Sequence, residues 1–96
     1  MKLIHFSKQN ELNFDADYIN NMDENGTYFY KDLTDEQISK LEIGWSDKYC
    51  HLFFLDDKYE SIVEDVQSFD ANETGLGFGY TEYFIKAEHL LKLEKW

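Results

Sequence analysis

The sequence predicts a single small globular domain of the α+β class over residues 1–96, with a three- to four-stranded sheet and three to four short helices. The length of 96 residues is near the usual size of one domain and leaves no room for a second core. Hydrophobic residues make up 43% of the chain and aromatic residues 18%, which is enough for a packed core. Apolar residues recur at both strand and helix spacings, so both kinds of element are expected.

The N-terminal third predicts a strand, a helix and a second strand, in that order. "KLIHF" at residues 2–6 has the composition of a short strand. Large apolar residues stand four apart within residues 14–22, which predicts a short helix. An Asn-Gly pair at residues 25–26 predicts a turn, and the aromatic run at residues 28–30 predicts the strand that follows it.

The middle of the chain predicts a helix and a buried strand. Thr34 is followed by Gln37 at the spacing of a capping box, and Gly44 is a plausible end for the helix. Residues 48–55, "KYCHLFFL", form a segment that is shorter than a typical helix and rich in aromatic residues, so we expect a buried strand there.

The C-terminal part is more ambiguous. A second capping-box pattern that begins at Asp57, followed by apolar residues at helical spacing, predicts a helix over residues 58–68. Glycines alternate with large apolar residues over residues 75–80, which predicts a strand. The last segment fits either one helix or a strand followed by a helix. We expect a strand up to Ile85 and a helix from Ala87, because the glycines and aromatic residues favour β structure.

The net charge of −11 argues against several classes of partner. All nine basic residues are lysine, so the chain has no arginine for bidentate phosphate recognition, and we expect binding neither to nucleic acid nor to membranes. No apolar run approaches the roughly 18 residues of a membrane-spanning helix, and the N-terminus lacks the pattern of a signal peptide. The single cysteine, Cys50, cannot form an internal disulfide, so a cytoplasmic location is expected.

Two segments hold the charge imbalance: residues 15–36 and residues 56–73 each carry a net charge of −6. Within the helix expected at residues 58–68, Glu60 and Glu64 are four apart, where like charges cost about 0.2–0.5 kcal/mol. A helix selected only for stability would more often carry a lysine at one of these positions. The pattern therefore favours a surface for a basic partner over ordinary solvation.

Metal and catalytic sites are each suggested by a short motif that fails at a required position. Residues 70–75, "DANETG", match the first half of a calcium-binding loop, but Thr81 stands where such a loop has a bidentate glutamate. The three histidines are far apart in the sequence, so they do not form a metal-binding pattern. Cys50 is expected to be a buried structural residue rather than a catalytic nucleophile. Residues 75–79, "GLGFG", lack the spacing of a phosphate-binding loop. We expect no metal, no cofactor and no enzymatic activity.

The remaining hypothesis is binding of a basic protein. Tyrosines lie in or beside both acidic segments, and interface energy usually rests on a few aromatic anchors while charges set the on-rate and the choice of partner. If the two segments share one face, that face would meet a basic surface such as the nucleic-acid cleft of a nuclease.

In composition and charge placement, the chain resembles bacterial immunity proteins against nuclease toxins, or phage-encoded DNA mimics. The resemblance implies a stoichiometric inhibitor of a basic partner, and an immunity protein is the form of it that we expect. The other candidate is a structural or assembly domain whose acidic face only solvates it. The expected partner-binding residues are acids and tyrosines of the two segments: Asp15, Asp17, Asp23, Glu24, Tyr28, Tyr30, Asp56, Asp57, Tyr59, Glu60, Glu64, Asp65, Asp70 and Glu73.

Overall fold

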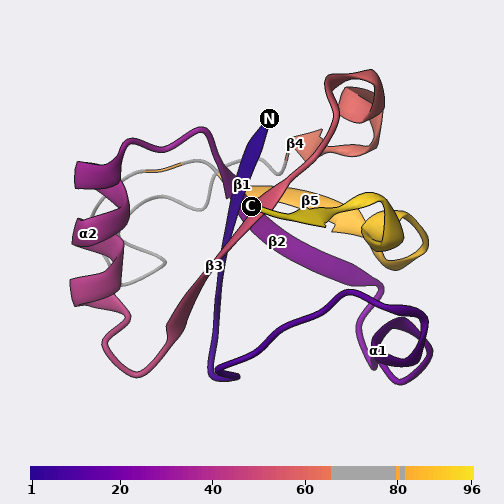
Figure 1. The fold of residues 1–96 in the computed structure, drawn as a ribbon, viewed down its shortest axis with the longest axis horizontal. Coiled ribbons are helices and arrows are strands. Elements are labelled where there is room, and N and C mark those ends of the chain that lie inside the picture. Colours follow the sequence, from indigo (N-terminus) through magenta and orange to yellow (C-terminus); the bar gives the residue numbers. More distant parts are fainter. Residues whose placement is uncertain (66–79, 81) are drawn as a thin grey trace.

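The computed structural model describes residues 1–65, 80 and 82–96, and in this part of the chain an antiparallel sheet has six strands. Their order across the sheet is β4-β5-β2-β1-β3-β6 (Figure 1). The α+β class is confirmed, but the predicted number of strands is too small, because two strands are two-residue edge pairings without a pattern of their own. The strands are β1 (Lys2–Ser7), β2 (Gly26–Lys31), β3 (Tyr49–Phe54), β4 (Glu64–Asp65), β5 (Glu82–Lys86) and β6 (Glu94–Lys95).

Helices cover both faces of the sheet. Figure 1 shows α2 (Asp35–Gly44) on one side, and α1 (Ala16–Asn20) with the 3₁₀ helices η1 (Asp57–Ile62) and η2 (Ala87–Lys92) on the other. None of the helices in the described residues is long and apolar enough to cross a membrane.

Alternation along the strands supplies apolar side chains to both faces. Leu3 and Ile4 of β1 are neighbours in sequence, and both are fully buried, at 0% exposed. Leu3 belongs to the cluster on the α1 side, where Phe14 packs against Phe29 and Phe53 with ring centroids 5.8 and 4.9 Å away. Ile4 belongs to the cluster on the α2 side. That second cluster is completed by Phe6, Tyr30, Ile38 and Leu41.

The capping box of α2 is confirmed. The Gln37 backbone N–H donates to Thr34 Oγ1 at 3.2 Å, and the Thr34 N–H donates to Gln37 Oε1 at 2.9 Å. These two bonds satisfy donors that the first helical turn leaves without partners. Gly44 is the last helical residue, as the sequence suggested.

The Asn-Gly pair does not form a hairpin turn. Gly26 is the first residue of β2 and pairs with Lys86 of β5, while the Ala87 N–H donates to the Asn25 carbonyl at 2.8 Å. A Cβ at Gly26 would lie 2.9 Å from Lys86 Cα, and closer still to the carbonyl oxygen of Ile85. Glycine is therefore required here by the close approach of two backbones.

The helix predicted over residues 58–68 is confirmed for residues 58–62, as a 3₁₀ helix, and wrong for residues 64 and 65. The 3₁₀ helix η1 ends at Ile62, and Glu64 and Asp65 form β4, which pairs with β5. Asp56, not Asp57, caps η1, because its Oδ1 accepts from the Lys58 N–H at 3.1 Å. Pairing with β5 prevails over the local helical pattern. Residues 66–68, and all of the strand predicted at 75–80 except its last residue, lie outside the described residues.

The prediction for the C-terminal segment is confirmed, with one addition. The strand β5 ends at Lys86, and η2 begins at Ala87, although η2 is a 3₁₀ helix. The unpredicted strand β6 then pairs with β3, and the Trp96 N–H donates to the Leu52 carbonyl at 3.1 Å.

Candidate functional site

Strands β1 and β2 diverge, and His5 lies where they separate. The ladder between these two strands pairs Leu3 with Lys31 and Ile4 with Tyr30. Beyond it, His5 Nδ1 lies 2.8 Å from the Tyr28 carbonyl oxygen. Because a carbonyl only accepts hydrogen bonds, Nδ1 carries the proton. Burial is the main cause that lowers the pKa of His5 below 6.5, so the ring is neutral at pH 7.

A cavity of about 620 Å³ opens beside this divergence. Tyr28 and Phe84, paired across β2 and β5, line it with ring centroids 5.1 Å apart. Tyr28 is 47% exposed, so its ring is accessible from solvent. The rest of the lining comes from β1, from the turn after α1, from the start of β2 and from α1 itself: His5, Tyr18, Asp23, Glu24, Asn25, Gly26 and Thr27.

Two further depressions adjoin this cavity, and Glu24 lines all three. One, of about 420 Å³, extends along α1 past Asp17 and Tyr18. The other, of about 570 Å³, extends past Phe84 to Glu88 at the start of η2. We call the three together the α1 groove.

Three acids of the α1 groove have no cationic partner within the described residues, whereas Glu88 Oε1 lies 3.5 Å from His89 Nε2. No ion pair there involves Asp17, Asp23 or Glu24. The lysine of the groove, Lys86, pairs with Glu64, with Nζ and Oε1 3.7 Å apart. Burial first and the charge of Glu24 second raise the pKa of Tyr18, so this carboxylate acts electrostatically on a groove side chain.

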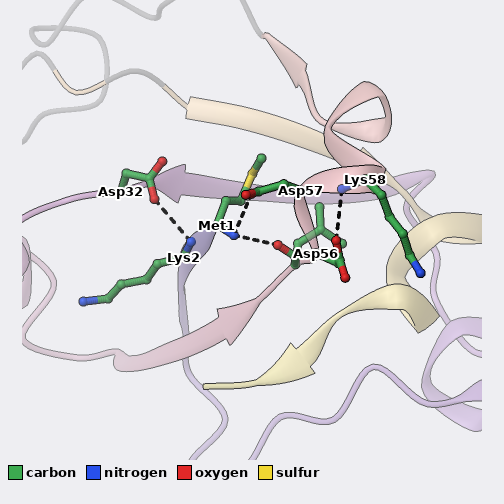
Figure 2. Close-up of polar contacts among 7 residues, drawn as sticks. Met1, Lys2, Asp32, Asp56, Asp57 and Lys58 are labelled. Atoms are coloured by element: carbon green, nitrogen blue, oxygen red, sulfur yellow. Dashed lines mark hydrogen bonds and ion pairs between the residues drawn. The ribbon is translucent and has the colours of Figure 1, made fainter.

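The described acids of the second segment have more local contacts. Asp57 Oδ1 lies 3.2 Å from the N-terminal ammonium of Met1, and Asp56 caps η1 through Lys58 (Figure 2). The Tyr59 ring has the ammonium groups of Lys58 and Lys92 at 5.1 and 5.4 Å from its centroid. Several of these side chains therefore already serve the fold.

As far as the described residues show, the two acidic segments do not form one continuous patch. The first surrounds α1, and the described part of the second surrounds η1, with η2 between them in Figure 1. The end of the first segment, with Asp35 and Glu36, begins α2 on the other side of the sheet. The unfavourable helical pair of Glu60 and Glu64 is also wrong, because Glu64 belongs to β4.

The other expected binding residues have varied positions. Asp15 caps α1 by accepting from the Tyr18 N–H at 2.9 Å, and Glu60 is exposed on η1. Tyr30 is only 6% exposed and belongs to the core, where burial first and Glu82 second raise its pKa to about 12. Asp65 is in β4. Asp70 and Glu73 lie outside the described residues.

Sequence reasoning did not assign His5, Tyr18 and Phe84 to the site. His5 is one of three scattered histidines, and Phe84 is one of many aromatic residues in the chain. They reach the cavity through the pairing of β2 with β5 and the divergence of β1, which no short motif encodes. The nearest signal was the helical spacing of Tyr18 within the first acidic segment.

The described residues carry no group of three or more histidine, cysteine, aspartate or glutamate side chains that could hold a metal ion. The calcium-loop match at 70–75 lies outside them. Burial first and the charge of Glu42 second raise the pKa of Cys50 to about 11. Its thiol is therefore protonated at neutral pH, which is the reverse of what an activated nucleophile needs.

No protein-family model, curated protein or solved structure matches this chain. A functional assignment therefore depends on the geometry and the charges of the α1 groove.

Proposed function

We propose that this protein is an acidic inhibitor that binds a basic protein partner through the α1 groove and neutralises it. The observation that carries the proposal is the set of carboxylates of Asp17, Asp23 and Glu24, which have no ion-pair partners among the described residues. Asp23 and Glu24 line the same cavity as the exposed ring of Tyr28, and Asp17 lines the adjoining depression. Aromatic anchors surrounded by charges of one sign are typical of interfaces in which the anchor supplies affinity and the charges select the partner.

The partner class that we propose is the nuclease domain of a bacterial toxin, which would make this chain an immunity protein. A nuclease presents lysines and arginines where it binds phosphates, and carboxylates of an inhibitor can occupy those positions. The net charge of −11 would speed the encounter with such a surface by electrostatic attraction. Binding by this mechanism weakens as salt screens the charges.

The proposal is tested by affinity capture with two charge-matched variants. The tagged protein is incubated with native lysate and with purified toxin nuclease domains, at low and at high salt, and retained proteins are identified by mass spectrometry. The groove variant carries Asp17→Asn, Asp23→Asn and Glu24→Gln. The control variant loses three exposed acids that line none of the three depressions, through Glu42→Gln, Asp47→Asn and Glu94→Gln.

We expect the wild type and the control variant to retain a basic protein that salt releases, and the groove variant to lose it. Retention of that protein by all three forms would contradict the role of the α1 groove. A recovered nuclease should also lose activity when one equivalent of the wild type is added. Absence of any basic partner from both sources would contradict the inhibitor hypothesis.

A structural or assembly domain is the second candidate, and one observation favours it. Phe54 of β3 and Trp96 after β6 are 38% and 63% exposed, with ring centroids 6.1 Å apart, at the edge of the sheet. Apolar rings at a sheet edge can join two copies of a chain. Sedimentation equilibrium would show self-association that persists in high salt and disappears in Trp96→Ser if this candidate is correct.

A further inference from the structure

We propose that the cavity lined by Tyr28, Phe84 and Glu24 binds one cationic side chain, an arginine or a lysine, of the partner protein. The inference rests on the proposed function, because it names the chemical group that the α1 groove would recognise. The inferred site is more specific than a general match between an acidic and a basic surface. It assigns one cavity as the place where a single residue of the partner is anchored.

The aromatic part of the cavity suits a cation. Tyr28 and Phe84 are paired across β2 and β5, and the planes of their rings are inclined by 53°, so the two rings form a corner. Gly26 lines the same cavity and adds no side chain to it. A cation near aromatic ring faces is attracted by their negative electrostatic potential, and a guanidinium can also stack on a ring.

The polar part of the cavity supplies the opposite charge. Asp23 and Glu24 both line it, and neither forms an ion pair within the described residues. Glu24 contributes to the raised pKa of Tyr18, which also lines the cavity, so its field extends into this space. Hydrogen bonds between a carboxylate and a guanidinium or an ammonium are charge-assisted and stronger than neutral ones.

The remaining lining offers no competing positive charge at neutral pH. No lysine of the described residues lines the cavity, and the His5 ring is neutral because burial lowers its pKa. An anion would be repelled by the two carboxylates, and an apolar group would leave them without partners. The volume of about 620 Å³ lies within the range of about 300–1,000 Å³ typical of ligand sites, so a long side chain can enter.

The experiment uses small probes, so that it does not depend on finding the partner. N-acetyl-argininamide and N-acetyl-lysinamide are titrated into the full chain, and N-acetyl-citrullinamide serves as a neutral control of nearly the same shape as the arginine probe. Backbone amide signals are followed by NMR. We expect at least one cationic probe to shift the signals of Asn25 to Tyr28 and of Phe84, with a dissociation constant on the order of millimolar. The citrulline probe should bind about tenfold more weakly.

Two variants locate the binding. Tyr28→Leu removes an aromatic face from an exposed strand position, and Glu24→Gln removes one charge with little change of shape. Each should weaken the binding of the cationic probe about three- to tenfold. Glu42→Gln removes a charge from α2, on the other side of the sheet, and should leave the affinity unchanged. The amide spectrum of each variant shows whether it is folded, and Glu24→Gln decides the test if Tyr28→Leu is not.

The outcomes separate this inference from the proposed function. If the cationic probes bind in the cavity but no basic protein is ever captured, the cation site is supported and the inhibitor function is contradicted. If a basic partner is captured but the cationic probes shift nothing in the cavity, the cation site is overturned and the inhibitor function stands. Equal binding of citrulline and arginine probes would also overturn the cation site.

Discussion

Gly26→Ala is the substitution whose effect on stability follows most directly from the structure. The new Cβ would lie 2.9 Å from Lys86 Cα and nearer to the Ile85 carbonyl oxygen, whereas carbon atoms pack best at about 3.5–4.0 Å. Both obstructing atoms are backbone, and the pairs of Gly26 with Lys86 and of Thr27 with Ile85 hold them in place. The third close atom, Cζ of Phe84, belongs to a ring that also lines the cavity.

The cost should therefore be near the upper end of the about 1–3 kcal/mol that overpacking costs. For a domain of this size, about 3 kcal/mol lowers Tm by roughly 12–24 °C, which thermal denaturation followed by circular dichroism can measure. Gly44→Ala is the matched control: it changes the last residue of α2 and should be neutral, or stabilising by up to about 1 kcal/mol. If Gly26→Ala unfolds within about 2 °C of the wild type, the close approach of β2 and β5 is wrong.

Three further predictions concern single side chains. Thr34→Ala removes one arm of the capping box and should cost about 1 kcal/mol, seen as a Tm about 4–8 °C lower, whereas Ser39→Ala in mid-helix should change it little. The pKa of Cys50 is raised from 9.0 to about 11, so at pH 8 iodoacetamide should react about a hundredfold more slowly with the folded chain than with the urea-unfolded chain. A comparable rate would contradict the raised pKa of this thiol. His5 has a folded pKa below 6.5, so only the unfolded chain gains its proton just below pH 6.5. Its contribution to stability is complete above that pH and decreases as the pH falls, so urea titrations of His5→Asn between about pH 7 and 5.5 should show a weaker pH dependence.

Sequence motifs and composition predicted the elements that are stabilised by residues close together in the chain. The capping box of Thr34 and Gln37 set the start of α2, and both of its hydrogen bonds are present. The apolar and aromatic segments near the N-terminus and before Leu55 are indeed strands, β1 and β3. In these segments the composition and the tertiary environment favour the same conformation, which is the condition under which propensity is informative.

Pairing between distant strands decided the elements that were not predicted. Residues 64–65 have helical spacing to the residues before them, yet they pair with β5 and form β4. The strand β6 is likewise only two residues long and exists through its pairing with β3. A two-residue strand has no periodicity of its own, so the sequence offers no pattern from which to derive it.

The acidic character of the candidate site was predictable, but its shape was not. Asp23 and Glu24 were expected to bind a partner because they lie in a segment of excess charge, and they line the cavity. Their aromatic neighbour Phe84 is sixty residues later in the chain and meets Tyr28 only through the register of β2 and β5. Without knowledge of that register, the spacing of residues in the sequence could not show that Glu24 lies near the rings of Tyr28 and Phe84.

The contacts also change which charge reversals are informative. Asp57, Glu60 and Glu64 of the second acidic segment could be replaced with lysine, but two of these acids have cationic partners: the Met1 ammonium and Lys86. Reversing them would put like charges side by side and alter the stability of the fold as well as any complex, so a loss of binding would have two explanations. Glu24 has no such partner within the described residues and an exposed side chain. Its replacement therefore tests binding without first removing an interaction that holds the fold together.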